Sequence, residues 1–231
     1  MATRRYSDAC GIARSLDVIG ERWALLVVRE LVFGPKRFTD LRAGLQGISQ
    51  NVLSQRLRDL EAAGVVTRTV LGPPASTQAY ELTALGHSLE PVLLAMSRWG
   101  ALTPPEPGAK MSNDAFALAL RALFVPAAAG APADSPAGAF VGRVRLRLTR
   151  DAFDVDVRPD RVEVTRAAGG DPSTVLEADE SVLRAVMFHR RTLDDAIERG
   201  DLRVRGGIAE ASAFLGRFAA PTLDDAVATG A

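Results

Sequence analysis

Amide, hydroxyl and guanidinium groups recur at helical spacing in the stretch from Ile48 to Gly64. Asn and Gln side chains match the hydrogen-bonding edge of adenine in a major groove, and an Arg side chain matches that of guanine. Leucines fall on the opposite side of the same predicted helix and anchor it in a core. The pattern predicts a helix that presents a polar face to bases, with an ordinary amphipathic surface helix as the alternative. The polar face comprises Gln50, Asn51, Ser54, Gln55 and Arg58, and the buried face comprises Leu53, Leu57 and Leu60.

Both ends of this predicted helix carry residues that suit a start and a stop. Ser49 can accept a hydrogen bond from a free N–H group of the first turn, so it is predicted as the N-cap and grouped with the candidate DNA contacts. Gly64 lies where a left-handed C-terminal cap is expected, a conformation that glycine adopts without steric cost.

The flanking segments predict the elements that hold this helix in place. Thr39 is predicted to cap a short helix that ends near Gly44, and Thr83 is predicted to cap a helix that reaches Trp99. A β-branched run and a return strand predict a hairpin after the groove helix. This order is typical of a winged helix–turn–helix, whose second helix enters the major groove. The other predicted helices cover 8–19 and 21–32, and the predicted strands cover 65–71 and 78–82.

Spaced motifs extend through all of these elements. They are Cys10-x-Ile12-Ala13-Arg14-x-Leu16-Asp17-Val18-Ile19-Gly20-x-Arg22-Trp23, Arg29-Glu30-Leu31, Gly34-Pro35-x-Arg37-Phe38-x-Asp40-Leu41, Ile48-Ser49-x-x-Val52-Leu53-Ser54-x-Arg56-Leu57-x-x-Leu60 and Tyr80-x-Leu82-Thr83-x-x-Gly86. Together they resemble the HxlR-type branch of winged-helix transcriptional regulators over about residues 8–100. The resemblance implies a homodimer that binds operator DNA and pairs through the first and last helices of the domain. Gly11 and Glu21 depart from the pattern, where many relatives have proline and glycine, and neither lies on the groove helix.

Basic and hydroxyl side chains around the groove helix are predicted to contact the DNA backbone. Phosphate contacts fix the register of a protein on DNA without reading its sequence. Arg56 lies near the edge of the buried face, so it either reaches the DNA or braces the domain. The wing tip has no Arg or Lys, so a weak wing contribution is expected. The candidates are Lys36, Arg37, Thr39 and Arg42 before the groove helix, and Arg68, Ser76, Thr77 and Gln78 in the wing.

The charge distribution favours a polyanionic partner for the first half of the chain. Residues 1–103 hold 12 Lys and Arg against 9 Asp and Glu, whereas residues 104–231 hold 16 against 19. No apolar run is long enough to span a membrane, and the N-terminus lacks the apolar core of a signal peptide. A single cysteine suits a reducing compartment. We therefore expect a cytoplasmic protein with no membrane partner.

Cys10 supports an alternative mode of regulation. It lies close to a predicted helix start with Arg14 one turn further on, and both features lower the pKa of a thiol. The HxlR-type resemblance implies that some relatives sense electrophiles or oxidants through a cysteine at this place. A redox- or electrophile-responsive regulator is therefore one alternative, and a small apolar residue packed at the dimer seam is the other interpretation of Cys10.

A second domain is predicted after a stiff Pro-rich linker at residues 104–112. The predicted first domain covers 1–103, the second covers 113–220, and a tail follows at 221–231. Asn113 is predicted to cap the first helix of the second domain. Strictly alternating strands between residues 142 and 166 place Arg and Asp rows on one side, which predicts cross-strand ion pairs on a solvated face. Residues 125–139 are predicted to form a mobile loop.

The later part of this domain resembles the sterol carrier protein fold, in which a sheet and helices enclose an apolar tunnel. The residues that carry the resemblance are Leu176-x-Ala178-Asp179, Leu183 and Ala196-Ile197-x-x-Gly200-x-Leu202-x-Val204-x-Gly206. It implies a small apolar effector that modulates operator affinity, and a lipid carrier whose helix–turn–helix only dimerises is a further alternative. The candidate cavity residues, which a plain core explains equally, are Leu146, Phe153, Val155, Met187, Phe188, Phe214 and Phe218.

The sequence contains no catalytic constellation. His87 and His189 are isolated and lack partners at metal-ligand spacing, so we expect neither a metal, a cofactor nor an enzyme activity. The predicted fold class is α+β, with an N-terminal winged helix–turn–helix domain and a C-terminal sterol carrier protein-like α/β domain whose sheet is mostly antiparallel. The predicted function is a DNA-binding transcriptional regulator, in the first place a repressor.

Overall fold

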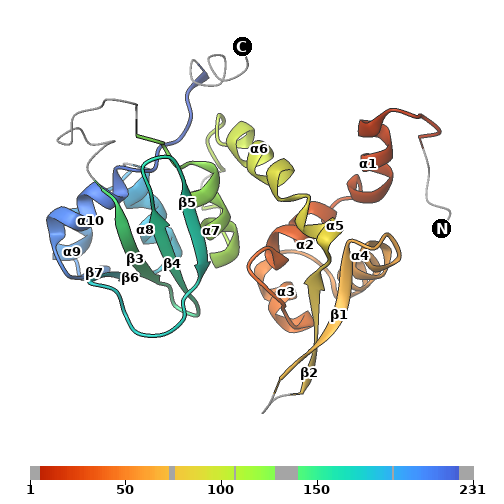
Figure 1. Cartoon of the computed structure of the whole chain (residues 1–231), viewed down its shortest axis with the longest axis horizontal. Coiled ribbons are helices and arrows are strands. Elements are labelled where there is room, and N and C mark those ends of the chain that lie inside the picture. Colours follow the sequence, from red (N-terminus) through yellow and green to blue (C-terminus); the bar gives the residue numbers. More distant parts are fainter. Residues whose placement is uncertain (1–5, 73–75, 107, 128–139, 189, 224–231) are drawn as a thin grey trace. The chain divides into compact units, whose positions relative to one another are not determined.

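The computed structural model describes residues 6–72, 76–106, 108–127, 140–188 and 190–223. The chain divides into two compact units, Met1–Leu93 and Leu94–Ala231, whose elements are labelled in Figure 1. The boundary falls inside helix α6 (Glu90–Gly100), earlier in the chain than the predicted linker.

The first unit has the element order of a winged helix–turn–helix (Figure 1). Its hairpin strands are antiparallel, with Val66 opposite Leu82 and Leu71 opposite Thr77. Lys36 adds an isolated bridge to Tyr80, which ties the turn before the third helix to the wing. The elements are α1 (Gly11–Ile19), α2 (Ala24–Leu31), α3 (Phe38–Gly44), α4 (Gln50–Ala62), β1 (Val66–Leu71), β2 (Thr77–Leu82) and α5 (Ala84–His87), followed by the start of α6.

One hydroxyl group fixes the base of the hairpin to its neighbours. Thr83 Oγ1 donates to the carbonyl of Gly64 at 2.6 Å and accepts the N–H of Gly86 at 3.1 Å. The predicted cap at Thr83 is therefore confirmed. A Cβ atom at Gly86 would lie 2.2 Å from the carbonyl oxygen of Val65, so this position admits only glycine without a shift of the backbone. The end of α4, the base of the hairpin and α5 thus meet at one point.

Several predicted helix boundaries in the first unit are wrong. The helices predicted to begin at residues 8 and 21 begin at Gly11 and Ala24. The N-cap of α3 is Arg37 rather than Thr39, because the backbone of Arg37 is extended and its carbonyl accepts the N–H groups of Asp40 and Leu41. The helix predicted from Thr83 to Trp99 is broken into α5 and α6. Pro91 explains the break, because proline lacks an N–H group and fits only the first turn of a helix.

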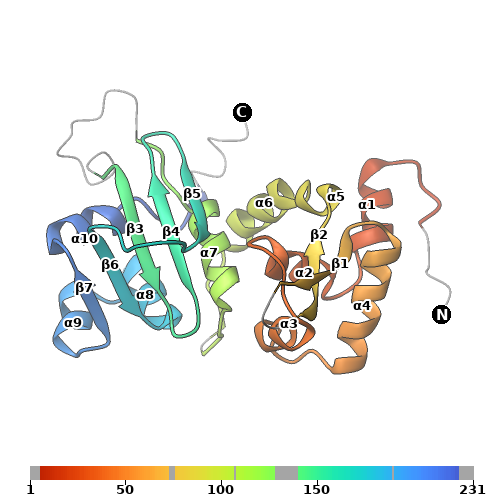
Figure 2. The same cartoon turned by 60° about the horizontal axis from the view of Figure 1, so that its bottom comes forward.

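The second unit is a five-stranded sheet of order β5-β4-β3-β6-β7 with helices packed against it (Figures 1 and 2). Only β3 and β6 are parallel, so the prediction of a mostly antiparallel sheet is confirmed. The elements are α7 (Asn113–Ala122), β3 (Gly142–Arg147), β4 (Ala152–Val157), β5 (Val162–Arg166), β6 (Thr174–Ala178), α8 (Glu180–Met187), α9 (Leu193–Glu198), β7 (Leu202–Arg205) and α10 (Ile208–Leu215).

The two sides of this sheet differ in polarity, as the alternation of the sequence predicts. The cross-strand pairs Arg143–Asp156 and Arg145–Asp154 form, with the charged atoms 3.2 and 2.7 Å apart. The second pair is not on a solvated face, however, since Arg145 is only 5% exposed. The connection between β5 and β6 crosses this face (Figure 2), and Arg145 donates to the carbonyls of Ala168 and Gly169.

The first helix of this unit has its cap one residue earlier than predicted. Ser112, not Asn113, caps α7, and its hydroxyl accepts the N–H of Ala115 at 3.1 Å. Most of the predicted mobile loop, residues 128–139, lies outside the described residues, and so does His189.

Candidate nucleic-acid interface

Helix α4 is anchored on the side that its leucines predict. Leu53, Leu57 and Leu60 are buried against the first unit's core. Ser49 is the N-cap, and its hydroxyl accepts the N–H of Val52 at 3.3 Å. Gly64 adopts a positive φ of 72°, the conformation that a side chain would strain. The predicted start and stop of the helix are both confirmed, and the polar face is held outward.

The first turn of α4 presents two amide side chains to solvent. Gln50 and Asn51 are exposed, and among the described residues neither side chain has a hydrogen-bond partner. Each amide carries both a donor and an acceptor, which is the set that an adenine edge requires. These two positions are therefore the part of α4 whose hydrogen-bonding capacity is open to a ligand.

Further along α4, the polar side chains bind one another. Gln55 Nε2 donates to Asp59 Oδ1 at 2.7 Å, and Arg58 Nη2 donates to Gln55 Oε1 at 2.7 Å. Ser54 is only half-exposed. These two hydrogen bonds fix the orientation of the Gln55 amide and hold Arg58 along the helix. Gln55 and Arg58 therefore already have partners within the helix, whereas the amides of the first turn have none among the described residues.

Arg56 braces the domain in this structure. Its guanidinium lies 3.2 Å from Asp59 and 3.6 Å from Glu21, which precedes α2, and its side chain is largely buried. The sequence allows Arg56 either to reach the DNA or to brace the domain, and the packing favours the bracing role. The Nε atom of Arg56 is buried without a partner among the described residues.

The candidate phosphate contacts fall into two groups. Thr39 and Arg42 are exposed on α3, and Arg37 is half-exposed at the start of that helix. Lys36 is placed differently, because its ammonium binds the buried carboxylate of Glu30 at 2.7 Å. The role of Glu30 was not predicted from the sequence, although a carboxylate near the end of a helix that is apolar apart from Arg29 and Glu30 is a usable signal.

The wing carries its one described cation at the base rather than near the tip. Arg68 Nη2 lies 3.1 Å from Glu61 on α4, and its guanidinium packs 5.9 Å from the centre of the Tyr80 ring. Ser76 and Gln78 are exposed and Thr77 is half-buried. The two contacts of Arg68 reduce the charge that the wing can offer to a phosphate.

Comparison with known proteins places this first unit in a family. The HxlR-like helix-turn-helix model matches residues 18–106. A Bacillus subtilis protein, the uncharacterized HTH-type transcriptional regulator YybR, is 38% identical over 93 residues, which are 40% of this chain and 74% of YybR. YkvN of the same organism, another uncharacterized HTH-type transcriptional regulator, is 39% identical over 92 residues, which are 40% of this chain and 78% of YkvN. The chain belongs to the HxlR-like helix-turn-helix family.

Solved structures also resemble part of this HxlR-like regulator. The crystal structure of quinone-bound YodB from B. subtilis is 32% identical, with a TM-score of 0.34, and the match covers 38% of this chain and 93% of YodB. Among the described residues, no helix combines the length and apolar character that a membrane crossing requires.

Cys10 of the HxlR-like regulator lies at the N-cap of α1 and is exposed. The backbone N–H groups of Ile12 and Ala13, at the start of the helix, lower the pKa of its thiol. The predicted position at a helix start is confirmed, and the helix supplies the cause of the shift.

The residues predicted to line an apolar cavity are packed in the second unit. Phe214 contacts the rings of Phe140 and Phe218 edge to face, with centres 5.6 and 5.2 Å apart. Phe188 is half-buried and packs beside α7. This packing favours the core interpretation, and effector binding stays a prediction. The fully buried candidates are Leu146, Phe153, Val155, Met187, Phe214 and Phe218.

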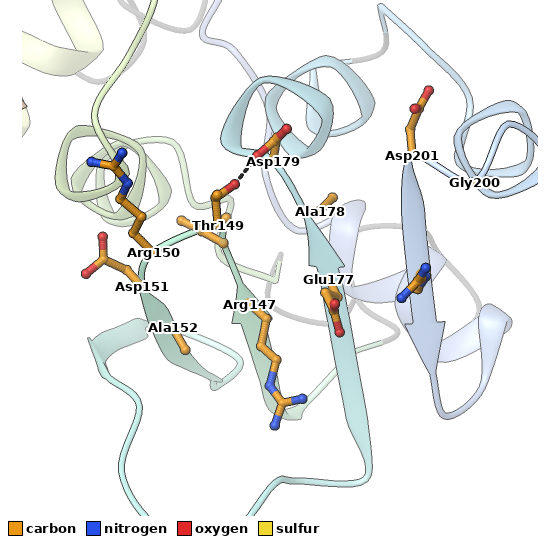
Figure 3. Close-up of a pocket in the computed structure, with 12 residues that line it drawn as sticks. Arg147, Thr149, Arg150, Asp151, Ala152, Glu177, Ala178, Asp179, Gly200 and Asp201 are labelled. Carbon is orange, nitrogen blue, oxygen red and sulfur yellow. Dashed lines mark hydrogen bonds between the residues drawn. The ribbon is translucent and has the colours of Figure 1, made fainter.

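A pocket of about 700 Å³ in the second unit is lined by other residues. Figure 3 shows it at the ends of the strands, where Thr149 donates a hydrogen bond to Asp179. Arg147, Glu177 and Arg203 bring charges of both signs to its lining. Such a lining lacks the apolar surface that a lipid requires.

Proposed function

We propose that this HxlR-like regulator binds operator DNA as a homodimer and represses transcription where the operator overlaps a promoter. The observation that carries the proposal is the pair of open amides at Gln50 and Asn51 on the first turn of α4. In a helix–turn–helix, the N-terminal residues of the second helix face the base edges in the major groove. The buried leucines of α4 hold those amides in the required direction.

Basic side chains that precede α4 supply the contacts that do not depend on sequence. Arg37 and Arg42 lie at the start and near the end of α3, the helix that precedes the groove helix. Neither has an ion-pair partner among the described residues, which leaves both charges available to phosphates. Arg68 contributes less, because Glu61 and Tyr80 already engage it.

Exposed apolar side chains support the homodimer. Ile12 on α1 is 72% exposed and Trp99 on α6 is 77% exposed, and Leu16 and Met96 add further apolar surface on the same two helices. Large apolar residues exposed on the surface of a helix mark an interaction site, and each of these two helices carries such residues. A two-fold dimer would present two α4 helices to half-sites about 34 Å apart, one turn of the duplex.

The proposal is tested with operators selected from random duplex DNA by the full-length protein. Asn51→Ala removes both hydrogen bonds to one base, so it should cost about 1–3 kcal/mol at one position of the site and little elsewhere. Fluorescence anisotropy on a panel of single-base operator variants measures this loss.

Arg37→Ala is the matched control, because it should weaken binding to every variant alike and reduce the dependence on salt. A uniform loss with Asn51→Ala would remove Asn51 from the base-reading set. Failure of the wild-type protein to enrich any sequence would refute the proposed function.

Regulation through Cys10 is a second candidate function. The observation that favours it is the lowered thiol pKa of an exposed residue at the N-cap of α1. Because α1 also carries apolar surface proposed for the dimer, modification of this thiol would act on the spacing of the two groove helices.

A further inference from the structure

A buried carboxylate stands where α2 meets both ends of α3. The side chain of Glu30 is 0% exposed. Its Oε1 accepts from Arg29 at 2.9 Å, and its Oε2 accepts from Lys36 Nζ at 2.7 Å. Removing a carboxylate from water is costly unless opposite charge and hydrogen bonds compensate it, so these cations are required by the fold.

The backbone of Lys36 is fixed as firmly as its ammonium. Its N–H donates to the carbonyl of Tyr80 at 3.0 Å, and its carbonyl accepts from the N–H of Tyr80 at 2.8 Å. The side chain of Lys36 is 12% exposed, in contrast to that of the exposed Arg42. Lys36 therefore links α2 to the wing immediately before α3 begins.

The C-terminal end of α3 lies beside the same carboxylate. A Cβ atom at Gly44 would lie 2.1 Å from Glu30 Oε2, so a larger residue there would have to displace the Glu30 carboxylate from its present position. One carboxylate thus contacts the residue that precedes Arg37 and the residue that ends α3. The chain then needs only a short turn to reach Ser49 and α4.

We propose that Lys36 is a positioning residue of the DNA interface and not a phosphate contact, and that Glu30 sets the helix–turn–helix through Lys36 and Gly44. A phosphate that approached the ammonium of Lys36 would have to compete with a carboxylate already bound to it. Because the ammonium of Lys36 is already paired with a carboxylate in the free protein, we expect it to add no phosphate contact, and so no released counterion, when DNA binds. The inference rests on the proposed function, since it concerns how the same interface is held.

The test compares operator affinity and its salt dependence in full-length variants. Lys36→Met leaves Glu30 without one counter-charge, so operator affinity should fall by about tenfold or more. The double variant Glu30→Met/Lys36→Met removes the carboxylate and one cation, so the net charge of the site stays the same, and Arg29 remains as a cation whose side chain is 21% exposed to water. It should recover most of that loss, because a buried ion pair can be replaced by apolar side chains. Its slope of log K against log salt should equal that of the wild type.

Arg42→Gln is the matched control, since it removes one exposed cation from α3. Its slope should fall by about 0.9, the value for one lost phosphate contact. A slope reduced by the same amount in the double variant, without recovery of affinity, would overturn the proposal and restore Lys36 as a phosphate contact. If Lys36→Met alone does not fold, the slope and affinity of the double variant decide the question. If the wild-type protein binds no operator at all, the proposed function is refuted instead.

Discussion

At the scale of single residues, the start of α1 changes the chemistry of a thiol. Cys10 is exposed, and the N–H groups of Ile12 and Ala13 lower its pKa. A lowered pKa raises the thiolate fraction at neutral pH, and the thiolate is the nucleophile. The helix therefore makes Cys10 more reactive than an exposed cysteine in an unfolded chain.

This reactivity gives a pH-dependent prediction. The rate of Cys10 alkylation by iodoacetamide should rise at lower pH in the native protein than in the urea-unfolded protein, because a lowered pKa moves the thiolate midpoint down. If the thiol also regulates binding, diamide should release wild-type protein from its operator and leave the Cys10→Ser variant bound. Equal alkylation midpoints in the two states would contradict the pKa direction, and equal diamide responses would exclude regulation through Cys10.

Residue type alone does not show which side chains of the interface are open to DNA and which are bound within the protein. The open amides of Gln50 and Asn51 follow from helical spacing, because their environment depends on neighbours in the same helix. Lys36 and Arg42 look equivalent in sequence, yet one binds Glu30 and the other is exposed. That difference arises from a contact between α2 and the entry to α3, which local pattern does not contain.

At the scale of elements, periodicity predicts which segments become helices and strands, and single residues then move their ends. The leucines of α4 and the alternating strands of the second unit were predicted correctly. Pro91 breaks the helix that begins after Thr83, and a proline at this place in the sequence is itself a signal for such a break. The burial of Arg145 could not be predicted, since it depends on where the connection between β5 and β6 crosses the sheet.

The close approach at Gly86 yields a prediction about stability. Gly86→Ala should lower the free energy of unfolding by about 1–3 kcal/mol, because the added methyl group meets the carbonyl of Val65 and forces a shift. Urea denaturation monitored by circular dichroism measures this change. Gly100→Ala on α6 is the control, since open space surrounds a Cβ there and alanine favours a helix. A similar loss in both variants would show that Gly86 is not constrained by Val65.

At the scale of the whole molecule, the two units differ in what is known of their relatives. The family match covers residues 18–106, so it supports a role in transcription through the first unit. The second unit has its own sheet and a core of phenylalanine rings. The packing of its described residues explains why apolar and charged residues alternate along its strands. That packing does not by itself assign a ligand to the second unit.

The proposed homodimer yields the prediction at this scale. Ile12→Glu places a charge on apolar surface of α1, so the dimer dissociation constant should rise by about tenfold or more. Sedimentation velocity over a range of concentrations measures it, and affinity for a two-half-site operator should fall in parallel. Arg14→Glu, which places a negative charge at an exposed position on the opposite side of α1, is the control. An unchanged dissociation constant in Ile12→Glu would place the interface elsewhere.

The hydrogen bonds of the Thr83 hydroxyl bear on how the DNA preference of related regulators can change. Because it joins the carbonyl of Gly64 to the N–H of Gly86, the hairpin is secured where it leaves α4. Exposed positions of the described wing strands, such as Val70 and Gln78, can therefore gain basic side chains without disturbing the register of α4. New preferences for flanking DNA could accumulate there while base reading by the groove helix is preserved.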